Sequence, residues 1–326
     1  MKPIRPNLWL AILLRRGFQL LSLALIIGTL CFLMIRSLPG DMAMRIAAGR
    51  YGFDLVGTGA AEAVRAELAS QLSGWPALIG WLGDVFRLDL GRSLVTGETV
   101  WSEVSHQLGA TLRLSLASLV LAVLVGLPVG IWCSHHPGGW IDRLVMSVTV
   151  LLRATPPFLI AVLLMLLVAV KLGALPVAGD GSASSLILPG LTLALGLAAG
   201  LARVVRNTIL EVKTTRYYEF ARTKGLSDWQ ALMRHGLRHS AVPIVAYLGV
   251  QAVFLVEGTV VVETLFAWPG IGHALVHAIF ARDVPVIQGT ALLIGLLFIG
   301  FNLLLDAVSL LIDPRRQALP HGRVTS

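Results

Sequence analysis

The sequence predicts an all-α protein that crosses a membrane several times. Hydrophobic residues make up 56% of the 326 residues, charged residues only 13%, and the mean hydropathy is +0.80. Such a small charged fraction is too low to cover a water-soluble globule of this size. Six apolar runs approach the length of about 20 residues that a helix needs to cross a bilayer. The predicted spans are Gly17–Ile35, Thr111–Trp132, Val145–Val170, Leu186–Ala202, Pro243–Phe266 and Gln288–Ile312.

The first apolar run is predicted to be an uncleaved membrane span. It is too long for the apolar core of a signal peptide, and no small-x-small cleavage site precedes Arg36. A long segment of mixed character follows, in which residues 60–72 are predicted as a surface helix and residues 78–86 as an amphipathic piece suited to the membrane interface. The two cysteines, Cys31 and Cys133, fall in or beside spans and are interpreted as packing residues rather than as a disulfide or metal clip.

Lysine and arginine set the expected orientation, because cytoplasmic loops of membrane proteins are enriched in them. With a cytoplasmic N-terminus, that side receives the basic N-terminal residues, a cluster at 203–238 and the basic C-terminal tail. The two short loops on the opposite side hold one cation each, Lys171 and Arg282. Both termini are therefore predicted to be cytoplasmic. The net charge of +8 reflects this bias and does not indicate a nucleic acid partner.

A basic insert between the fourth and fifth spans, residues 203–243, is predicted to fold into two short helices. Thr215 is expected to cap the first helix through its side chain. Arg222 and Lys224 lie in the last turn of that helix, where cations favour the helix dipole. Gly225 follows as the C′ residue, since glycine adopts the left-handed conformation without a side-chain penalty.

The second helix of the insert is predicted to open with a capping box. Ser227 and Gln230 have the required spacing, with serine at the N-cap and glutamine at N3. Apolar side chains are expected on one face and two arginines on another. These residues are Trp229, Leu232, Met233 and Leu237, and Arg234 and Arg238. Folded helices on the charged side of the membrane favour a docking element for a partner, and a positively charged topogenic loop is the alternative.

No catalytic residue, cofactor or metal is predicted. The sequence contains no Gly-x4-Gly-Lys-Ser/Thr pattern, so the chain is not expected to bind and hydrolyse nucleotide by itself. His135 and His136 lie in a short turn without an obvious third ligand, which favours a solvated turn over a metal site. His273 and His277 can share a helix face, but they lack the glutamate of a His-Glu-x-x-His motif and are interpreted as an interfacial pair.

Ionisable residues at membrane depth are costly and often functional. Arg113, Arg153 and Asp306 lie within a turn or two of predicted span ends, where snorkelling or headgroup contact accounts for them. Glu257 lies near the middle of the fifth span, and the neighbouring sequence offers no cation to pair with it. It is a candidate translocation-pathway residue, and a structural hydrogen bond between helices is the equal alternative.

The basic insert also carries a resemblance to a known family. Residues 218–225, Tyr-Glu-Phe-Ala-Arg-Thr-Lys-Gly, resemble the cytoplasmic EAA loop of permease subunits of binding-protein-dependent ABC importers. In that family the loop is a coupling helix that docks in a groove on the ATPase subunit. Phe220 departs from the pattern, since the family usually has alanine there. The resemblance implies an ATPase-coupling loop that includes Tyr218, Glu219, Ala221, Gly225 and Arg234.

Other stretches are similar to the dipeptide, oligopeptide and nickel branch of that family. They lie at 91–93, 110–112, 234–238, 261–272, 282–285 and 311–316. The resemblance spans nearly the whole chain and implies a type I ABC importer transmembrane domain with six transmembrane helices, in the layout of the "B" subunit. Glu257 departs from the branch, which usually has a small residue there. The implied partners are a related second permease subunit, two cytoplasmic ABC ATPase subunits, a periplasmic solute-binding protein and membrane lipid.

The predicted function is an inner-membrane permease subunit of a bacterial ATP-driven importer. It forms half of the translocation pathway for peptides or a related solute, such as a nickel or metal chelate or an opine-like conjugate, while its partner ATPases hydrolyse ATP. An ion-gradient-driven secondary transporter and a membrane scaffold are the alternatives, and no internal repeat supports the former. The predicted regions are a cytoplasmic N-terminus with the first transmembrane helix (1–36), a periplasmic segment (37–108), the transmembrane core (109–312) with its cytoplasmic coupling loop (203–242), and a cytoplasmic tail (313–326).

Overall fold

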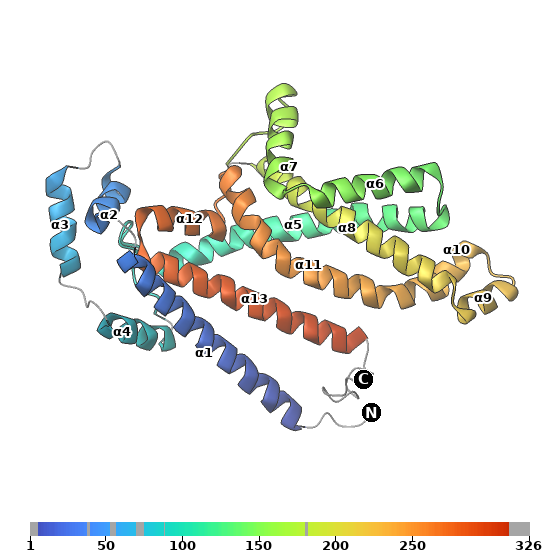
Figure 1. The fold of residues 1–326 in the computed structure, drawn as a ribbon, viewed down its shortest axis with the longest axis horizontal. Helices are drawn as coiled ribbons and strands as arrows, with labels where there is room; N and C mark the ends of the chain where they lie inside the picture. The colour runs from blue at the N-terminus through green and yellow to red at the C-terminus, as the bar shows by residue number, and fades with distance from the viewer. Residues whose placement is uncertain are drawn as a thin grey trace. The chain divides into compact units, whose positions relative to one another are not determined.

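The computed structural model describes residues 6–37, 40–52, 57–69, 75–87, 89–179 and 182–312, and the regular elements in these ranges are helices (Figure 1). The chain divides into two compact units. Unit 1 comprises Met1–Thr111 and Pro269–Ile299, and unit 2 comprises Leu112–Trp268 and Gly300–Ser326. The helices are α1 (Pro6–Ser37), α2 (Met42–Tyr51), α3 (Thr58–Ala69), α4 (Trp75–Phe86), α5 (Val100–His135), α6 (Trp140–Ala154), α7 (Pro157–Leu164), η1 (Met165–Lys171), η2 (Ala183–Leu186), α8 (Ile187–Lys213), α9 (Arg216–Thr223), α10 (Asp228–Ala231), η3 (Leu232–Gly236), α11 (Leu237–Leu265), α12 (Ile271–Ala281) and α13 (Val284–Ile312).

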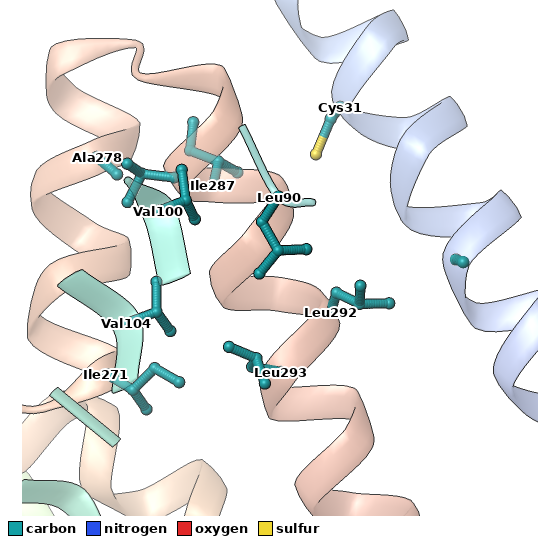
Figure 2. Packing of buried hydrophobic residues seen from close by; sticks show 11 residues of the cluster. Cys31, Leu90, Val100, Val104, Ile271, Ala278, Ile287, Leu292 and Leu293 are labelled. Carbon is teal, nitrogen blue, oxygen red and sulfur yellow. The ribbon is translucent and has the colours of Figure 1, made fainter. Parts of the chain in front are cut away.

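An apolar core holds unit 1 together. It draws on α1, the loop before α5, the first turns of α5, and helices α12 and α13. Figure 2 labels Cys31, Leu90, Val100, Val104, Ile271, Ala278, Ile287, Leu292 and Leu293 of this cluster. The interpretation of the two cysteines agrees with the structure, since Cys31 and Cys133 are both buried free thiols.

The loop before α5 is fixed by the carboxylate of Asp283, which lies between α12 and α13. The Ser93 hydroxyl donates to this carboxylate, and the backbone N–H groups of Leu94 and Val95 donate to it at 3.1 and 3.2 Å. Each carboxylate oxygen therefore has donors, which offsets the cost of burying the charge. In the segment before this loop, the predicted surface helix is confirmed as α3, and the predicted amphipathic piece lies on α4.

Helix α8 is the centre of unit 2, where α6, α7 and α11 pack against it. Small residues also bring it close to α5. A Cβ on Gly130 would lie 2.6 Å from the carbonyl oxygen of Ala202, and one on Gly126 would lie 2.8 Å from that of Ala198. Such close approach is how helices associate in a membrane, where lipid tails remove the hydrophobic drive between apolar helices.

Membrane-crossing helices coincide with the predicted spans. Three helices in the described ranges are long and apolar enough to cross a bilayer, namely Val100–His135, Ala183–Lys213 and Val284–Phe301. The first and fifth predicted spans lie on α1 and α11. The remaining predicted span lies on a helix pair that meets the same criteria when its two parts are taken together.

That third predicted span, Val145–Val170, is wrong as a single helix. It is broken between α6 and the α7–η1 segment, which meet at 105° (Figure 1). Thr155 at the break is extended, with φ −83° and ψ 125°. Pro156 follows it, and the residue before a proline is disfavoured from the helical conformation. Pro157 then begins α7 at a position where its missing N–H has no intrahelical partner to lose.

Candidate coupling site

The site is the segment between α8 and α11 in unit 2, which contains α9 and α10. The predicted side-chain cap of α9 is wrong. The Thr215 hydroxyl donates to the carbonyl of Val212 at 2.5 Å, and the backbone carbonyl of Thr215 accepts from the N–H groups of Tyr218 and Glu219 at 3.0 and 3.1 Å. The hydroxyl turns back because the last carbonyls of α8 also lack helical partners, and one of them lies within its reach.

The C-terminal end of α9 is confirmed. Gly225 has φ +89°, and its N–H donates to the carbonyl of Arg222 at 3.0 Å. The Arg222 guanidinium donates in turn to the carbonyl of Leu226 at 3.0 Å. The Lys224 ammonium lies 4.6 Å from the centroid of the Phe220 ring, a cation–π contact. Glycine is required at this turn because other residues rarely adopt a positive φ.

The predicted capping box is also confirmed. The N–H of Gln230 donates to the Ser227 hydroxyl at 3.2 Å, and the N–H of Ser227 donates to the side-chain oxygen of Gln230 at 3.0 Å. The helix that starts here is nevertheless not short. α10 continues through the π-helical turn η3 directly into α11, and Pro243 lies inside α11. The helix that contains the fifth predicted span therefore begins before Pro243, since a membrane helix tolerates an internal proline.

The predicted apolar face of this second helix is partly wrong. Leu232 is fully buried, but Trp229 and Met233 are 55% and 37% exposed. Arg234 is exposed as predicted, and the side chain of Arg238 lies outside the described residues. The exposed apolar side chains of α9 and α10–η3 are Tyr217, Phe220, Trp229 and Met233.

Two of the predicted coupling residues are packing residues. Tyr218 and Ala221 are buried in a cluster with apolar residues of α8, η3 and α11. The Tyr218 hydroxyl donates to the Asp228 carboxylate at 2.8 Å. Burial and this hydrogen bond raise the pKa of Tyr218 above its usual value, so the phenol remains a donor. Glu219 and Gly225 are exposed on the outer side of the segment.

Asp228 joins the segment to the ends of two long helices, a role that the sequence analysis did not predict. Its carboxylate accepts from the Lys213 ammonium at 3.0 Å, at the end of α8. The same ammonium donates to the carbonyl of Ser134 in α5 at 3.1 Å. The Nε2 atom of His135 lies 3.7 Å from the carboxylate. Burial raises the pKa of Asp228, but the hydrogen bonds from Lys213 and Tyr218 outweigh it and hold that pKa below its usual value.

A second ion pair fixes the same end of unit 2. Arg206 of α8 donates to both carboxylate oxygens of Asp142 in α6, each at 2.6 Å. Asp142 is buried and also accepts from the N–H of Gly138 at 2.8 Å. Bidentate arginine–carboxylate pairs hold a defined geometry. The loop between α5 and α6 is therefore tied to α8, beside which α9 begins.

Glu257, the remaining predicted site residue, lies in α11, but its side chain is outside the described residues. The structure therefore does not join it to the coupling residues. No group of three or more His, Cys, Asp or Glu residues within the described ranges has a metal-binding arrangement. The α9–α10 segment is a surface element with exposed aromatic and charged side chains, an arrangement that could dock a protein.

The family comparison identifies the class of protein that has this fold and this element. Residues 126–318 match the family described as "Binding-protein-dependent transport system inner membrane component". The chain belongs to this family. Its fold is similar to that of a chain in the inward-facing MetNI methionine ABC transporter, with a TM-score of 0.57, 20% identity, and coverage of 65% of this chain and 96% of that one.

Relatives that are similar along nearly the whole chain show which kind of permease subunit within this family the protein resembles. The chain is 36% identical to a protein of Brucella abortus (strain 2308) named as a peptide transport system permease, over 94% of this chain and 98% of the relative. It is 35% identical to the glutathione transport system permease protein GsiC of Escherichia coli O6:H1 (strain CFT073), over 92% and 97%. The protein is thus a multi-pass inner-membrane permease subunit of an ABC importer with the type I transmembrane fold, and the ion-gradient alternative is wrong.

Proposed function

We propose that this chain is the "B"-type permease subunit of an importer for small peptides and forms half of its translocation pathway. The class of transported solute is supported by the near full-length similarity to relatives named for peptide and glutathione transport. Peptides are therefore preferred over the nickel chelates and opine-like conjugates that the sequence left open. The partners are a related second permease, two ATPases that hydrolyse the ATP, and a periplasmic binding protein.

The α9–α10 segment is the ATPase-docking element in this proposal. Its exposed aromatic residues, with Glu219 and Arg234 beside them, supply apolar and charged contacts for a groove on the ATPase. Its buried side supports the transfer of motion, because Tyr218 and Asp228 bind it to the ends of α5 and α8. When the ATPases close on ATP, the segment and the membrane helices move together and the pathway opens toward the binding protein.

The proposed orientation places α9–α10, residues 1–5 and the 313–326 tail in the cytoplasm and the 37–108 segment in the periplasm. Single cysteines in place of Glu98 and Ser182, both exposed, are expected to react with an impermeant thiol reagent added to intact cells, after Cys31 and Cys133 are replaced. A cysteine in place of Lys224 is expected to react only after lysis. Labelling of the Lys224 position in intact cells would reverse the orientation.

Glu257 is proposed as a pathway residue that attracts a cationic group of the cargo. It lies one residue before Gly258, which lines a cavity between α8 and α11. A carboxylate at membrane depth is expensive unless it faces a polar path or a partner. The proposal needs no change in the fold, since α11 is continuous through this position.

Reconstitution tests the function as a whole. The permease is co-expressed with its partner permease and ATPases, placed in liposomes and supplied with its binding protein. We expect uptake of labelled tripeptides, including glutathione, that requires ATP and survives collapse of ion gradients. Uptake of a nickel chelate but of no peptide would contradict the proposed cargo.

A further inference from the structure

The break between α6 and α7 lies inside the third predicted span and has an arginine beside it. Arg153 lies in the last turn of α6 and is exposed. At about 1.5 Å of rise per residue it is about 20 Å along the helix from Trp140, in a bilayer whose hydrocarbon core is about 30 Å thick. Because the helix turns by 105° here instead of continuing in one direction, we take Arg153 to lie within the bilayer, where the snorkelling interpretation would not apply. A charge at this depth is retained where it faces a polar path or binds a partner.

A cavity of about 190 Å³ lies at this break, within unit 2. The α6–α7 break, α8 and α11 supply its walls, and most of its lining is apolar. Its polar lining residues are Arg153, Thr155, Thr192 and Gln251. The two threonine hydroxyls donate to carbonyls of their own helices, Leu151 and Leu188, at 2.8 Å each. Arg153 and the buried Gln251 are therefore the side chains with N–H donors available to a guest.

The Tyr247 hydroxyl lies near the same guanidinium. A Cβ on Gly200 would lie 1.9 Å from this hydroxyl oxygen and 3.5 Å from an Arg153 nitrogen, so both groups meet over one point of α8. Only glycine leaves room for the tyrosine there. The hydroxyl is buried and has no hydrogen-bond partner within the described residues. Those residues also form no ion pair with Arg153.

The hydrogen-bond donors at this cavity that are unpaired among the described residues indicate a ligand that offers acceptor oxygens. The planar guanidinium presents N–H groups in a fork that matches a carboxylate, and the tyrosine and glutamine add neutral donors around it. We propose that the α6–α7 break is a carboxylate-binding site on the translocation pathway, formed by Arg153, Tyr247 and Gln251. This inference rests on the proposed peptide cargo: the site binds the C-terminal carboxylate of the peptide during its passage.

A pair of peptides that differ only at this group tests the site. The reconstituted importer is supplied with a tripeptide and with its C-terminal amide, a pair chosen so that the wild type imports both. Uptake is normalised to assembled complex and expressed as the acid-to-amide ratio. The binding protein's own preference cancels, because every variant uses the same binding protein.

Arg153→Gln is expected to lower the acid-to-amide ratio about tenfold, the effect of losing a charge-assisted hydrogen bond of about 1.4 kcal/mol or more. Arg153→Lys is expected to give an intermediate ratio, since it keeps the charge and loses the fork. Tyr247→Phe, which removes only the hydroxyl, is expected to lower the ratio two- to threefold and gives a second test if an Arg153 variant does not assemble. Lys171→Gln removes an exposed cation at the far end of η1 and is the matched control, with the ratio unchanged.

An unchanged ratio in Arg153→Gln and Tyr247→Phe would overturn the site, even if uptake of both peptides fell. That pattern would mean that Arg153 pairs with a carboxylate of the protein, such as Glu257 or a group on the second permease, or with a lipid phosphate. Failure of the proposed function gives a different result. In that case the wild-type importer takes up neither peptide with ATP.

Discussion

The α9–α10 segment and the α6–α7 break each hold a charged side chain, and the two charges differ in how many hydrogen-bond partners surround them. Asp228 accepts hydrogen bonds from Lys213 and Tyr218 and has His135 beside it. Arg153 faces a cavity with a second unsatisfied donor nearby. Several donors on one carboxylate favour a single geometry, because a rearrangement would leave some of these donors without an acceptor. The donors at the α6–α7 break have no acceptor among the described residues and can therefore bind a ligand.

The strongest disruption of the fixed region is expected from Gly225→Pro. Proline cannot adopt the φ of +89° found here, and it also removes the N–H that donates to Arg222. We expect the protein to insert normally, while uptake falls about a hundredfold or more, as a loss near 3 kcal/mol implies. Gly225→Asn, which tolerates the left-handed region, is the control and keeps most uptake. Normal uptake and normal ATPase stimulation in Gly225→Pro would reject the coupling assignment.

A third ionisable residue, Glu257, sharpens the comparison. If Glu257 faces the pathway, Glu257→Gln keeps its size and removes its charge. Uptake of a cationic peptide, normalised to assembled complex, is then expected to fall roughly ten- to hundredfold. Abundance and basal ATPase activity stay near normal, since a neutral amide costs less to bury. A structural Glu257 gives the reverse, with lower abundance or melting temperature and preserved transport per complex.

Asp228→Ala tests the fixed network itself. It removes the carboxylate that accepts from the Lys213 ammonium and the Tyr218 hydroxyl, and leaves each donor only a backbone carbonyl. We expect a loss of about 1–2 kcal/mol in stability, measured as a lower thermal unfolding midpoint of the complex, with a severalfold loss of uptake. Glu211→Ala removes an exposed carboxylate near the end of α8 and is the matched control. Equal midpoints in the two variants would contradict the role given to Asp228.

The smallest expected effect is a pH dependence. The folded-state pKa of Asp228 is lowered, so its carboxylate contributes stability above its unfolded pKa of about 3.9 and loses that contribution as pH falls through the folded value. The pKa of Tyr218 is raised by burial and by its hydrogen bond to Asp228, so its hydroxyl stays a donor throughout this range. The difference in unfolding midpoint between wild type and Asp228→Asn is expected to be constant from about pH 5 to 8 and to shrink below about pH 4. A difference that grows on acidification would contradict this linkage.

Two local features were predictable from the sequence, although the Thr215 cap was not, and the long-range network was not. Gly225 and the Ser227–Gln230 capping box depend on residues at most three apart, so their spacing is visible in the chain. The network around Asp228 joins Ser134 and Lys213 across 79 positions, which no local pattern reveals. The break at Pro156 did have a sequence signal. The long apolar run obscured it, because hydropathy alone does not distinguish a straight helix from a bent one.

The run from Asp228 to Leu265 converts small rotations into large displacements. Because α10, η3 and α11 follow without a break, they form a rod about 55 Å long at about 1.5 Å per residue. A tilt of about 5° around one end moves the other by about 5 Å, close to one helical turn. The π-helical turn η3 interrupts the α-helical hydrogen-bond pattern near the Asp228 end of this run. A small change of angle at α10–η3 therefore produces a larger displacement at the Leu265 end of α11.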